Sequence, residues 1–206
     1  MKLLKERICQ EGLILSETVL KVDSFLNHQV DTELVLEIGK EFAQIFGDEP
    51  ITKVLTVEAS GIQFAMATAA ALGVPFLYAK KKKAITQAEK MYSASVFSFT
   101  RQETYQICVS QKYLGPSDKV LIVDDFLATG AALIGLTDIV KEAGAQLVGC
   151  GCVIEKSFQE GRNWLENKGV RVHSLARIAS MSPGKVEFLE EHHLNRQTQG
   201  REEIVK

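Results

Sequence analysis

The residues best suited to chemistry lie in the stretch 120–132, which reads VLIVDDFLATGAA. Its first four residues, 120–123, are apolar and rich in β-branched types, which predicts a strand buried on both faces. A helical pattern follows the small residues at its end. A turn from a strand into a helix leaves unpaired backbone N–H groups that suit a phosphate. The residues of this predicted phosphate loop are Ala128, Thr129, Gly130, Ala131 and Ala132.

Two adjacent carboxylates, Asp124 and Asp125, stand directly before this loop. They would repel a bare phosphate, so a phosphate ligand must also offer hydroxyl groups or a divalent cation. A ribose 5-phosphate meets this requirement, because carboxylates accept hydrogen bonds from the 2′- and 3′-hydroxyls while backbone amides hold the phosphate. The simpler alternative is a strand-to-helix turn in which an Asp caps the helix.

This stretch resembles the phosphoribosyl-pyrophosphate (PRPP) signature of type I phosphoribosyltransferases. Neither a Walker loop nor the G-x-G-x-x-G dinucleotide fingerprint occurs in the chain. The resemblance implies an α/β fold with a mainly parallel central sheet flanked by helices, a small hood and an antiparallel flap. It also implies that Asp124 and Asp125 are catalytic residues that anchor the ribose. Ala132 lacks the hydroxyl of the family's T-G-G-T loop, so backbone amides must carry more of the phosphate grip.

A second strand-to-helix turn, Glu58-Ala59-Ser60-Gly61, resembles the family's pyrophosphate loop, with Ser60 as a PRPP contact. Four lysines, residues 80–83, follow the apolar segment 74–79. A solvated charged face is the ordinary reading of such a run, but its position favours contact with the pyrophosphate, and Lys81 is the predicted catalytic lysine. The polar segment 84–94 is predicted to be a lid that shields the reaction from water.

The segment VIEKSFQEGR, residues 153–162, suggests a base-binding site. The ammonium of Lys156 can donate to the exocyclic oxygen of a 6-oxopurine, and Phe158 is available to pack near the ring. The alternative is a surface ion pair between Glu155 and Lys156.

Four stretches together resemble bacterial xanthine phosphoribosyltransferases: ILSETVLKVDSFLNHQV, IVDDFLATG, VIEKSFQEGR and SLARIAS. The likeness runs to about residue 190. It implies a hood over the purine, formed by residues 1–30 and a C-terminal segment, with xanthine contacts at Leu20, Asn27 and Lys156. Asn27 carries both a donor and an acceptor, which suits a base edge with carbonyl and N–H groups.

The resemblance implies transfer of the phosphoribosyl group of PRPP to N9 of xanthine, giving xanthosine 5′-monophosphate (XMP) and pyrophosphate in purine salvage. It further implies Mg²⁺ bound by PRPP rather than by protein ligands, and a homodimer. Alternatives are a hypoxanthine/guanine or adenine phosphoribosyltransferase, or a PRPP-sensing regulator that binds nucleic acid. The last requires a basic surface, whereas 24 basic and 26 acidic residues give a net charge of −2.

The 206 residues suit one domain, with residues 191–206 as a tail outside the resemblance. No apolar run approaches the length of a membrane span, which predicts a cytoplasmic protein without membrane contact. The four cysteines are predicted to be free thiols, and Cys150 and Cys152 to share one face of a strand.

The elements that must position these groups alternate along the chain, which favours a parallel sheet covered on both faces. The patterns predict strands over 51–57, 74–79, 120–123, 146–154 and 170–178, helices over 31–46, 62–72, 133–143 and 160–168, and a hairpin from 96–99 and 105–109. An amphipathic helix is expected before Gly12. The chemical motifs all follow strands, at the sheet edge where ligands of such folds bind.

Overall fold

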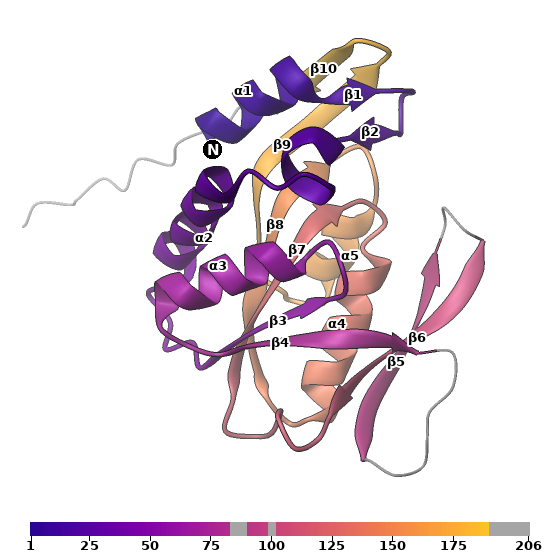
Figure 1. Cartoon of the computed structure of the whole chain (residues 1–206). Coiled ribbons are helices and arrows are strands. Elements are labelled where there is room, and N and C mark those ends of the chain that lie inside the picture. Colours follow the sequence, from indigo (N-terminus) through magenta and orange to yellow (C-terminus); the bar gives the residue numbers. More distant parts are fainter. Residues whose placement is uncertain (83–89, 99–101, 190–206) are drawn as a thin grey trace, which may run out of the picture.

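The computed structural model describes residues 1–82, 90–98 and 102–189, and its centre is an eight-stranded sheet (Figure 1). The strands are β3 (Lys53–Val57), β4 (Phe76–Lys82), β5 (Met91–Ser98), β6 (Glu103–Ser110), β7 (Lys119–Leu127), β8 (Gln146–Lys156), β9 (Val172–Ser182) and β10 (Lys185–Phe188). Their order is β10-β9-β8-β7-β3-β4-β6-β5. The central strands from β9 to β4 run parallel, while β10, β6 and β5 pair antiparallel with their neighbours.

Helices cover both faces of this sheet, and the residues of β7 alternate between the two apolar clusters that result. Leu121 and Val123 belong to the cluster that includes α2 (Thr32–Phe46) and α3 (Ile62–Leu72). Val120 and Ile122 belong to the cluster that includes α4 (Ala131–Glu142) and α5 (Gly161–Asn167). All four side chains are fully buried, which confirms the prediction of a strand buried on both faces.

The flanking helices begin and end where the sequence signals predict. The Asp31 carboxylate caps α2 by accepting a hydrogen bond from the Leu34 N–H at 3.1 Å. Gly73 ends α3 in the left-handed conformation, with φ of 69°. A Cβ at Gly39 of α2 would lie 2.5 Å from the backbone of Ala67, so glycine allows α2 and α3 to pack closely.

The first 27 residues lie beside the end of the described chain. They form α1 (Lys2–Glu11), the short strands β1 (Leu13–Ile14) and β2 (Leu20–Lys21), and a π-helical turn, η1 (Asp23–Asn27). In Figure 1, α1 and β1 lie next to β9 and β10. The amino terminus of Met1 donates to the Leu175 carbonyl at 2.5 Å, and the Lys5 ammonium lies 5.8 Å from the Phe188 ring. This arrangement places the predicted hood against the C-terminal strands.

The element order agrees with the sequence prediction, but several boundaries differ. Strand β4 extends through residues 80–82, so these lysines lie within a strand rather than after it. Strand β7 likewise extends through Asp124 and Asp125. The predicted loop 84–94 was wrong for residues 91–94, which belong to β5; residues 84–89 and the predicted tail 191–206 lie outside the described residues. Strand β10 was not predicted.

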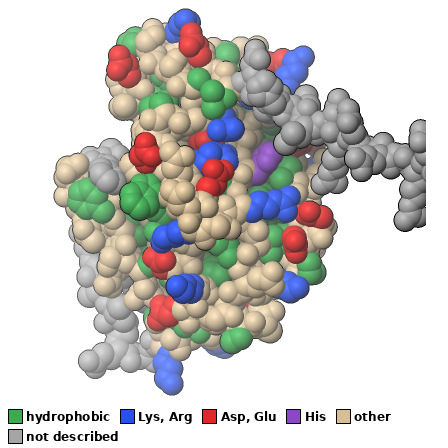
Figure 2. Space-filling model, turned by 180° about the vertical axis from the view of Figure 1, so that it is seen from behind, with side chains coloured by type: hydrophobic (Ala, Val, Ile, Leu, Met, Phe, Trp, Pro, Cys, Tyr) green, Lys and Arg blue, Asp and Glu red, His purple; other side chains and the backbone are tan. Residues whose placement is uncertain are grey.

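Side chains of both charges are interspersed on the face shown in Figure 2. None of the helices in the part of the chain that the structure describes has both the length and the apolar character needed to cross a bilayer.

The four cysteines differ sharply in exposure. Cys108, Cys150 and Cys152 are buried free thiols, whereas Cys9 on α1 is exposed. Cys150 and Cys152 belong to the same apolar cluster, which confirms that they share a face of β8. Burial raises the pKa of both thiols well above the usual range.

Candidate active site

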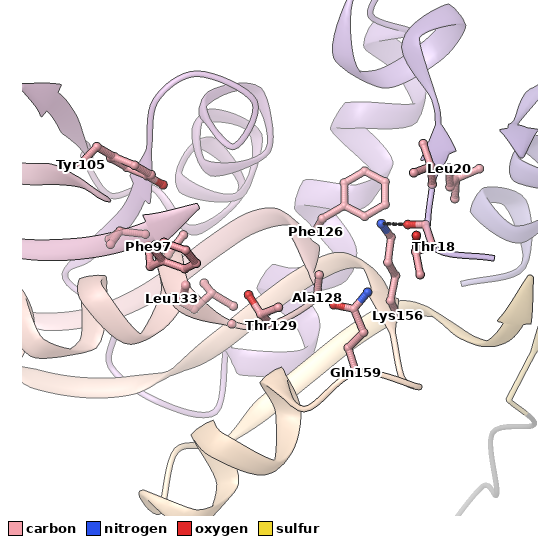
Figure 3. A pocket seen from close by; sticks show the side chains of 15 residues that line it. Thr18, Leu20, Phe97, Tyr105, Phe126, Ala128, Thr129, Leu133, Lys156 and Gln159 are labelled. Carbon is pink, nitrogen blue, oxygen red and sulfur yellow. Dashed lines mark hydrogen bonds between the residues drawn. The ribbon is translucent and has the colours of Figure 1, made fainter. Parts of the chain in front are cut away.

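A cavity of about 560 Å³ lies at the carboxyl ends of β7 and β8 (Figure 3). Its wall comes from the segment between β1 and β2, from the flap β5–β6, from the predicted phosphate loop and from the end of β8. The residues that line it are Thr18, Val19, Leu20, Val96, Phe97, Tyr105, Phe126, Ala128, Thr129, Gly130, Ala131, Ala132, Leu133, Lys156 and Gln159. The structure therefore brings all five residues of the predicted phosphate loop together with Leu20 and Lys156.

The phosphate loop connects β7 to the first turn of α4. Gly130 immediately precedes α4 and is left-handed, with φ of 80° and ψ of 2°, which glycine adopts without strain. A Cβ at this position would also lie 3.0 Å from the Cα of Gly161. Because α4 begins at Ala131, its first N–H groups have no partner within the helix. The loop thus offers backbone donors and the Thr129 hydroxyl to the cavity, between Phe97 and Lys156 (Figure 3).

The acid pair lies near the carboxyl end of β7 but does not line this cavity. Asp124 is 5% exposed, and burial, reinforced by the charge of Asp125, raises its pKa well above the usual range. Burial also raises the pKa of Asp125, while hydrogen bonds from Asn27, the Phe126 N–H and Ser60 oppose this shift. Both carboxyl groups of the pair therefore take up a proton more readily than solvated carboxyl groups do.

Ser60 lies close to the acid pair, and its side chain acts to lower the pKa of Asp125. The peptide bond between Glu58 and Ala59 in the same turn is cis. Gly61 packs directly against the acid pair, since a Cβ there would lie 2.6 Å from Asp124 Oδ1 and 2.0 Å from Thr56 Oγ1. The structure therefore joins the predicted pyrophosphate turn to the predicted ribose anchor.

Lys81 lies on β4 beside the flap. Its backbone N–H donates to Glu58 Oε1 at 2.6 Å, and its ammonium lies 5.3 Å from the centre of the Tyr105 ring. Its charge also acts to lower the pKa of Asp124. Lys81 thus stands between the turn at residue 58 and the cavity wall at Tyr105, although its own side chain does not line the cavity.

Lys156 occupies the opposite end of the cavity from the flap (Figure 3). Its ammonium donates to the Thr18 carbonyl at 2.7 Å and lies 5.4 Å from the centre of the Phe126 ring. Burial lowers its pKa, and the charge of Asp125 opposes the shift. The alternative interpretation, an ion pair of Lys156 with Glu155, was wrong: Glu155 pairs with Arg162 instead.

Asn27 reaches the acid pair rather than the cavity. Its Nδ2 donates to Asp125 Oδ2 at 3.0 Å, and its buried Oδ1 has no hydrogen-bond partner among the residues that the structure describes. Leu20, in contrast, lines the cavity and is 7% exposed. Val19 also lines the cavity and is 42% exposed.

The sequence analysis missed several cavity residues. Phe126, rather than the predicted Phe158, is the aromatic side chain next to Lys156; Phe158 is 39% exposed and does not line the cavity. The position of Phe126 directly after the acid pair was an available signal. Tyr105 and Gln159 carried no comparable signal, because β6 and the turn after β8 reach the cavity only through the fold.

Among the residues that the structure describes, no group of three His, Cys, Asp or Glu side chains is arranged to hold a metal ion. The hard oxygen donors of Asp124 and Asp125 suit a Mg²⁺ ion that keeps most of its ligands from water and a substrate phosphate.

The parallel sheet, the phosphate loop after β7 and the adjacent acid pair define a type I phosphoribosyltransferase fold. The family model for the phosphoribosyl transferase domain matches residues 27–170, and this chain belongs to that family. It is 69% identical to the xanthine phosphoribosyltransferase of Brevibacillus brevis over 191 residues, which cover 93% of this chain and 97% of the relative. It is 56% identical to the xanthine phosphoribosyltransferase of Shouchella clausii, with 93% and 96% covered.

Solved structures support the fold alone, since their sequences are distant. The adenine phosphoribosyltransferase of Giardia lamblia aligns with a TM-score of 0.71 at 23% identity, covering 84% of this chain and 97% of that one. That of Rhodothermus marinus aligns with a TM-score of 0.69 at 24% identity, covering 86% and 99%.

Proposed function

We propose that this protein is a xanthine phosphoribosyltransferase that converts xanthine and PRPP into XMP and pyrophosphate for purine salvage. The observation that carries the proposal is that the phosphate loop and Lys156 line one cavity in a chain 51–69% identical to enzymes of that name. The cavity offers donors for a phosphate at the loop and a cation for a carbonyl oxygen at Lys156.

Each predicted site residue then has a role in positioning or charge stabilisation. The amides of residues 128–132 hold the 5′-phosphate, and Asp124 and Asp125 accept hydrogen bonds from the ribose hydroxyls. Ser60 and Lys81 stabilise the departing pyrophosphate. When the bond between C1′ and pyrophosphate breaks, positive charge develops on the ribose, and N9 of the purine forms the new bond to C1′. A carboxylate of the acid pair accepts the proton that the purine loses.

At the base end, Lys156 donates to the 6-oxo group of xanthine while Phe126 lies beside the ring. Leu20 supplies an apolar contact. Asn27 does not line the cavity, so in this proposal it releases Asp125 and turns toward the base, to which its Oδ1 offers an acceptor.

Mg²⁺ enters this proposal as an ion carried by PRPP, where it offsets the charge of the pyrophosphate. We also infer a homodimer and a cytoplasmic location. The four free thiols fit a reducing compartment.

The test is a comparison of pyrophosphate release from PRPP and Mg²⁺ with xanthine, guanine, hypoxanthine or adenine, with the product identified by mass. We expect kcat/KM to be highest for xanthine and the product to be XMP. A preference for another purine would instead assign a sister phosphoribosyltransferase. Turnover of none, together with salt-sensitive binding to nucleic acid, would favour a PRPP-sensing regulator.

A further inference from the structure

Glu155, the residue before Lys156, is a buried carboxylate to which the proposed reaction assigns no role. It is 1% exposed at the end of β8. A buried charge is costly unless it is paired and hydrogen-bonded. Burial by itself raises the pKa of Glu155, but hydrogen bonds from Arg162 and Ser157 outweigh it and hold the pKa at about 2. This carboxylate is therefore ionised inside the protein and held by fixed donors.

Arg162 on α5 holds Glu155 through both carboxylate oxygens. Its Nε donates to Oε1 at 2.9 Å and its Nη2 to Oε2 at 2.6 Å. The same guanidinium donates to the Val172 carbonyl at 3.2 Å and the Ser174 hydroxyl at 3.3 Å on β9, and to Glu166 at 2.7 Å. Only a planar guanidinium can make these contacts together. The pair thus fixes the start of α5 to the end of β8 and the start of β9.

The segment held in this way, residues 156–161, connects Lys156 to the phosphate loop. Lys156 begins it and points toward Thr18 (Figure 3). Gly161 ends it and touches the phosphate loop: its N–H donates to the Ala128 carbonyl at 3.0 Å. A Cβ at Gly161 would lie 2.4 Å from that carbonyl and 2.8 Å from the Gly130 nitrogen, so helix and loop are in direct backbone contact.

We infer that the Glu155–Arg162 pair is a positioning device that sets the base-binding Lys156 and the phosphate loop relative to each other. Neither residue lines the cavity, so the pair acts through its neighbours rather than on the substrate. The pair closes a six-residue connection whose two ends are the proposed base and phosphate contacts, so loosening it moves both ends. The identity of the two ligands in this inference rests on the proposed function.

The test uses Arg162→Lys, which retains the charge that compensates Glu155 but cannot form the forked contacts. We expect KM to rise about tenfold for both xanthine and PRPP, because displacing a binding group by a fraction of an ångström weakens its contacts without removing them. Glu166→Gln is the matched control, because it removes the exposed partner of the same guanidinium. Its KM values should stay close to those of the original protein.

A double-variant comparison separates positioning from general stability. In a Lys156→Ala background, Arg162→Lys should no longer raise KM for xanthine, since the group it misplaces is gone, but should still raise KM for PRPP. Loss of folded protein would lower kcat per chain and leave both KM values unchanged, and that result would overturn the inference. With Lys156 in place, a rise in KM for one substrate only upon Arg162→Lys would overturn it as well.

Trp164, the chain's only tryptophan, provides a readout that does not depend on xanthine turnover. It lies on α5 and lines a second hollow together with Thr129 and Ala131 of the phosphate loop. PRPP with Mg²⁺ should change its fluorescence, and Arg162→Lys should shift the titration midpoint about tenfold upward. If the protein used another purine, this PRPP shift would still be expected. An unchanged midpoint in a folded Arg162→Lys protein would overturn the inference whatever the purine.

Discussion

The pKa values of the buried carboxyl groups Asp124 and Glu155 are shifted in opposite directions, although both side chains are almost inaccessible to solvent. Asp124 has a second carboxyl as its neighbour, and its pKa is raised by burial and by that charge. Glu155 has two guanidinium groups as partners, those of Arg162 and Arg177, and hydroxyl donors, and its pKa falls to about 2. The partners therefore decide which carboxyl is ready to take up a proton and which is a fixed charge.

Asp124→Asn should lower turnover while raising thermal stability. When a carboxyl group has a higher pKa in the folded than in the unfolded chain, the free energy of unfolding falls as pH rises above the pKa of the unfolded chain. A neutral amide at the same position removes this loss. We expect kcat to fall about 10²-fold or more, since the ribose anchor is weakened, and Tm at pH 8 to be no lower than in the original protein. Asp138→Asn, at an exposed carboxylate, is the control. Near-normal turnover would contradict the role of Asp124.

Glu155 should contribute to resistance against acid. Its pKa is lower in the folded chain than the ordinary 4.5, so its contribution to the free energy of unfolding is complete above pH 4.5 and is lost as pH falls toward 2. The shift corresponds to roughly 3 kcal/mol. Urea unfolding from pH 6 to pH 2.5 should show a smaller pH dependence in Glu155→Gln than in the original protein. Parallel curves would contradict this.

At the scale of elements, local signals predicted most of the fold. The cap at Asp31 and the glycine at residue 73 marked the ends of α2 and α3, and the apolar run 120–123 marked a doubly buried strand. Strand ends were less predictable. The lysines of β4 and the acids of β7 are polar, yet they continue their strands because neighbouring strands supply backbone partners. The residue types within a strand do not predict whether a neighbouring strand supplies such a backbone partner.

The contact between α5 and the phosphate loop predicts a specific sensitivity at Gly161. Gly161→Ala places a methyl group against the backbone of Ala128 and Gly130, so the loop must shift. We expect KM for PRPP to rise about tenfold or more, because binding depends steeply on the position of the loop amides. Gly115→Ala is the matched control, since a Cβ there meets nothing within 4 Å. Equal KM values for both variants would show that the contact has no role.

At the scale of the whole molecule, the candidate site is assembled from distant parts of the chain. The amide of Asn27 meets a carboxylate 98 residues away, and Lys156 meets a carbonyl 138 residues away. The residue types and the family resemblance predicted a set of site residues. They did not reveal that Asn27 holds Asp125, or that Phe126 rather than Phe158 lies beside Lys156, because these contacts depend on how the N-terminal segment folds over the sheet.

The proposed homodimer is a prediction at this scale. Light scattering coupled to gel filtration should give twice the chain mass of 22.8 kDa, at every concentration used for the activity assays. Several large apolar side chains outside the cavity, including Met66 at 49% and Trp164 at 57%, are exposed in the single chain and would gain from a partner. A single-chain mass in active protein would contradict the dimer.

The unequal burial of the cysteines makes the folded protein selective toward thiol reagents. A thiolate is the reactive form, and burial suppresses it at Cys150 and Cys152, while Cys9 faces solvent on α1. A maleimide dye should therefore add once per chain at neutral pH, as read by intact mass, and a Cys9→Ser variant should remain unmodified until denaturant is added. Because α1 contributes no residue to the cavity, we expect the labelled protein to keep its turnover. The enzyme can then be followed optically through the dye on Cys9.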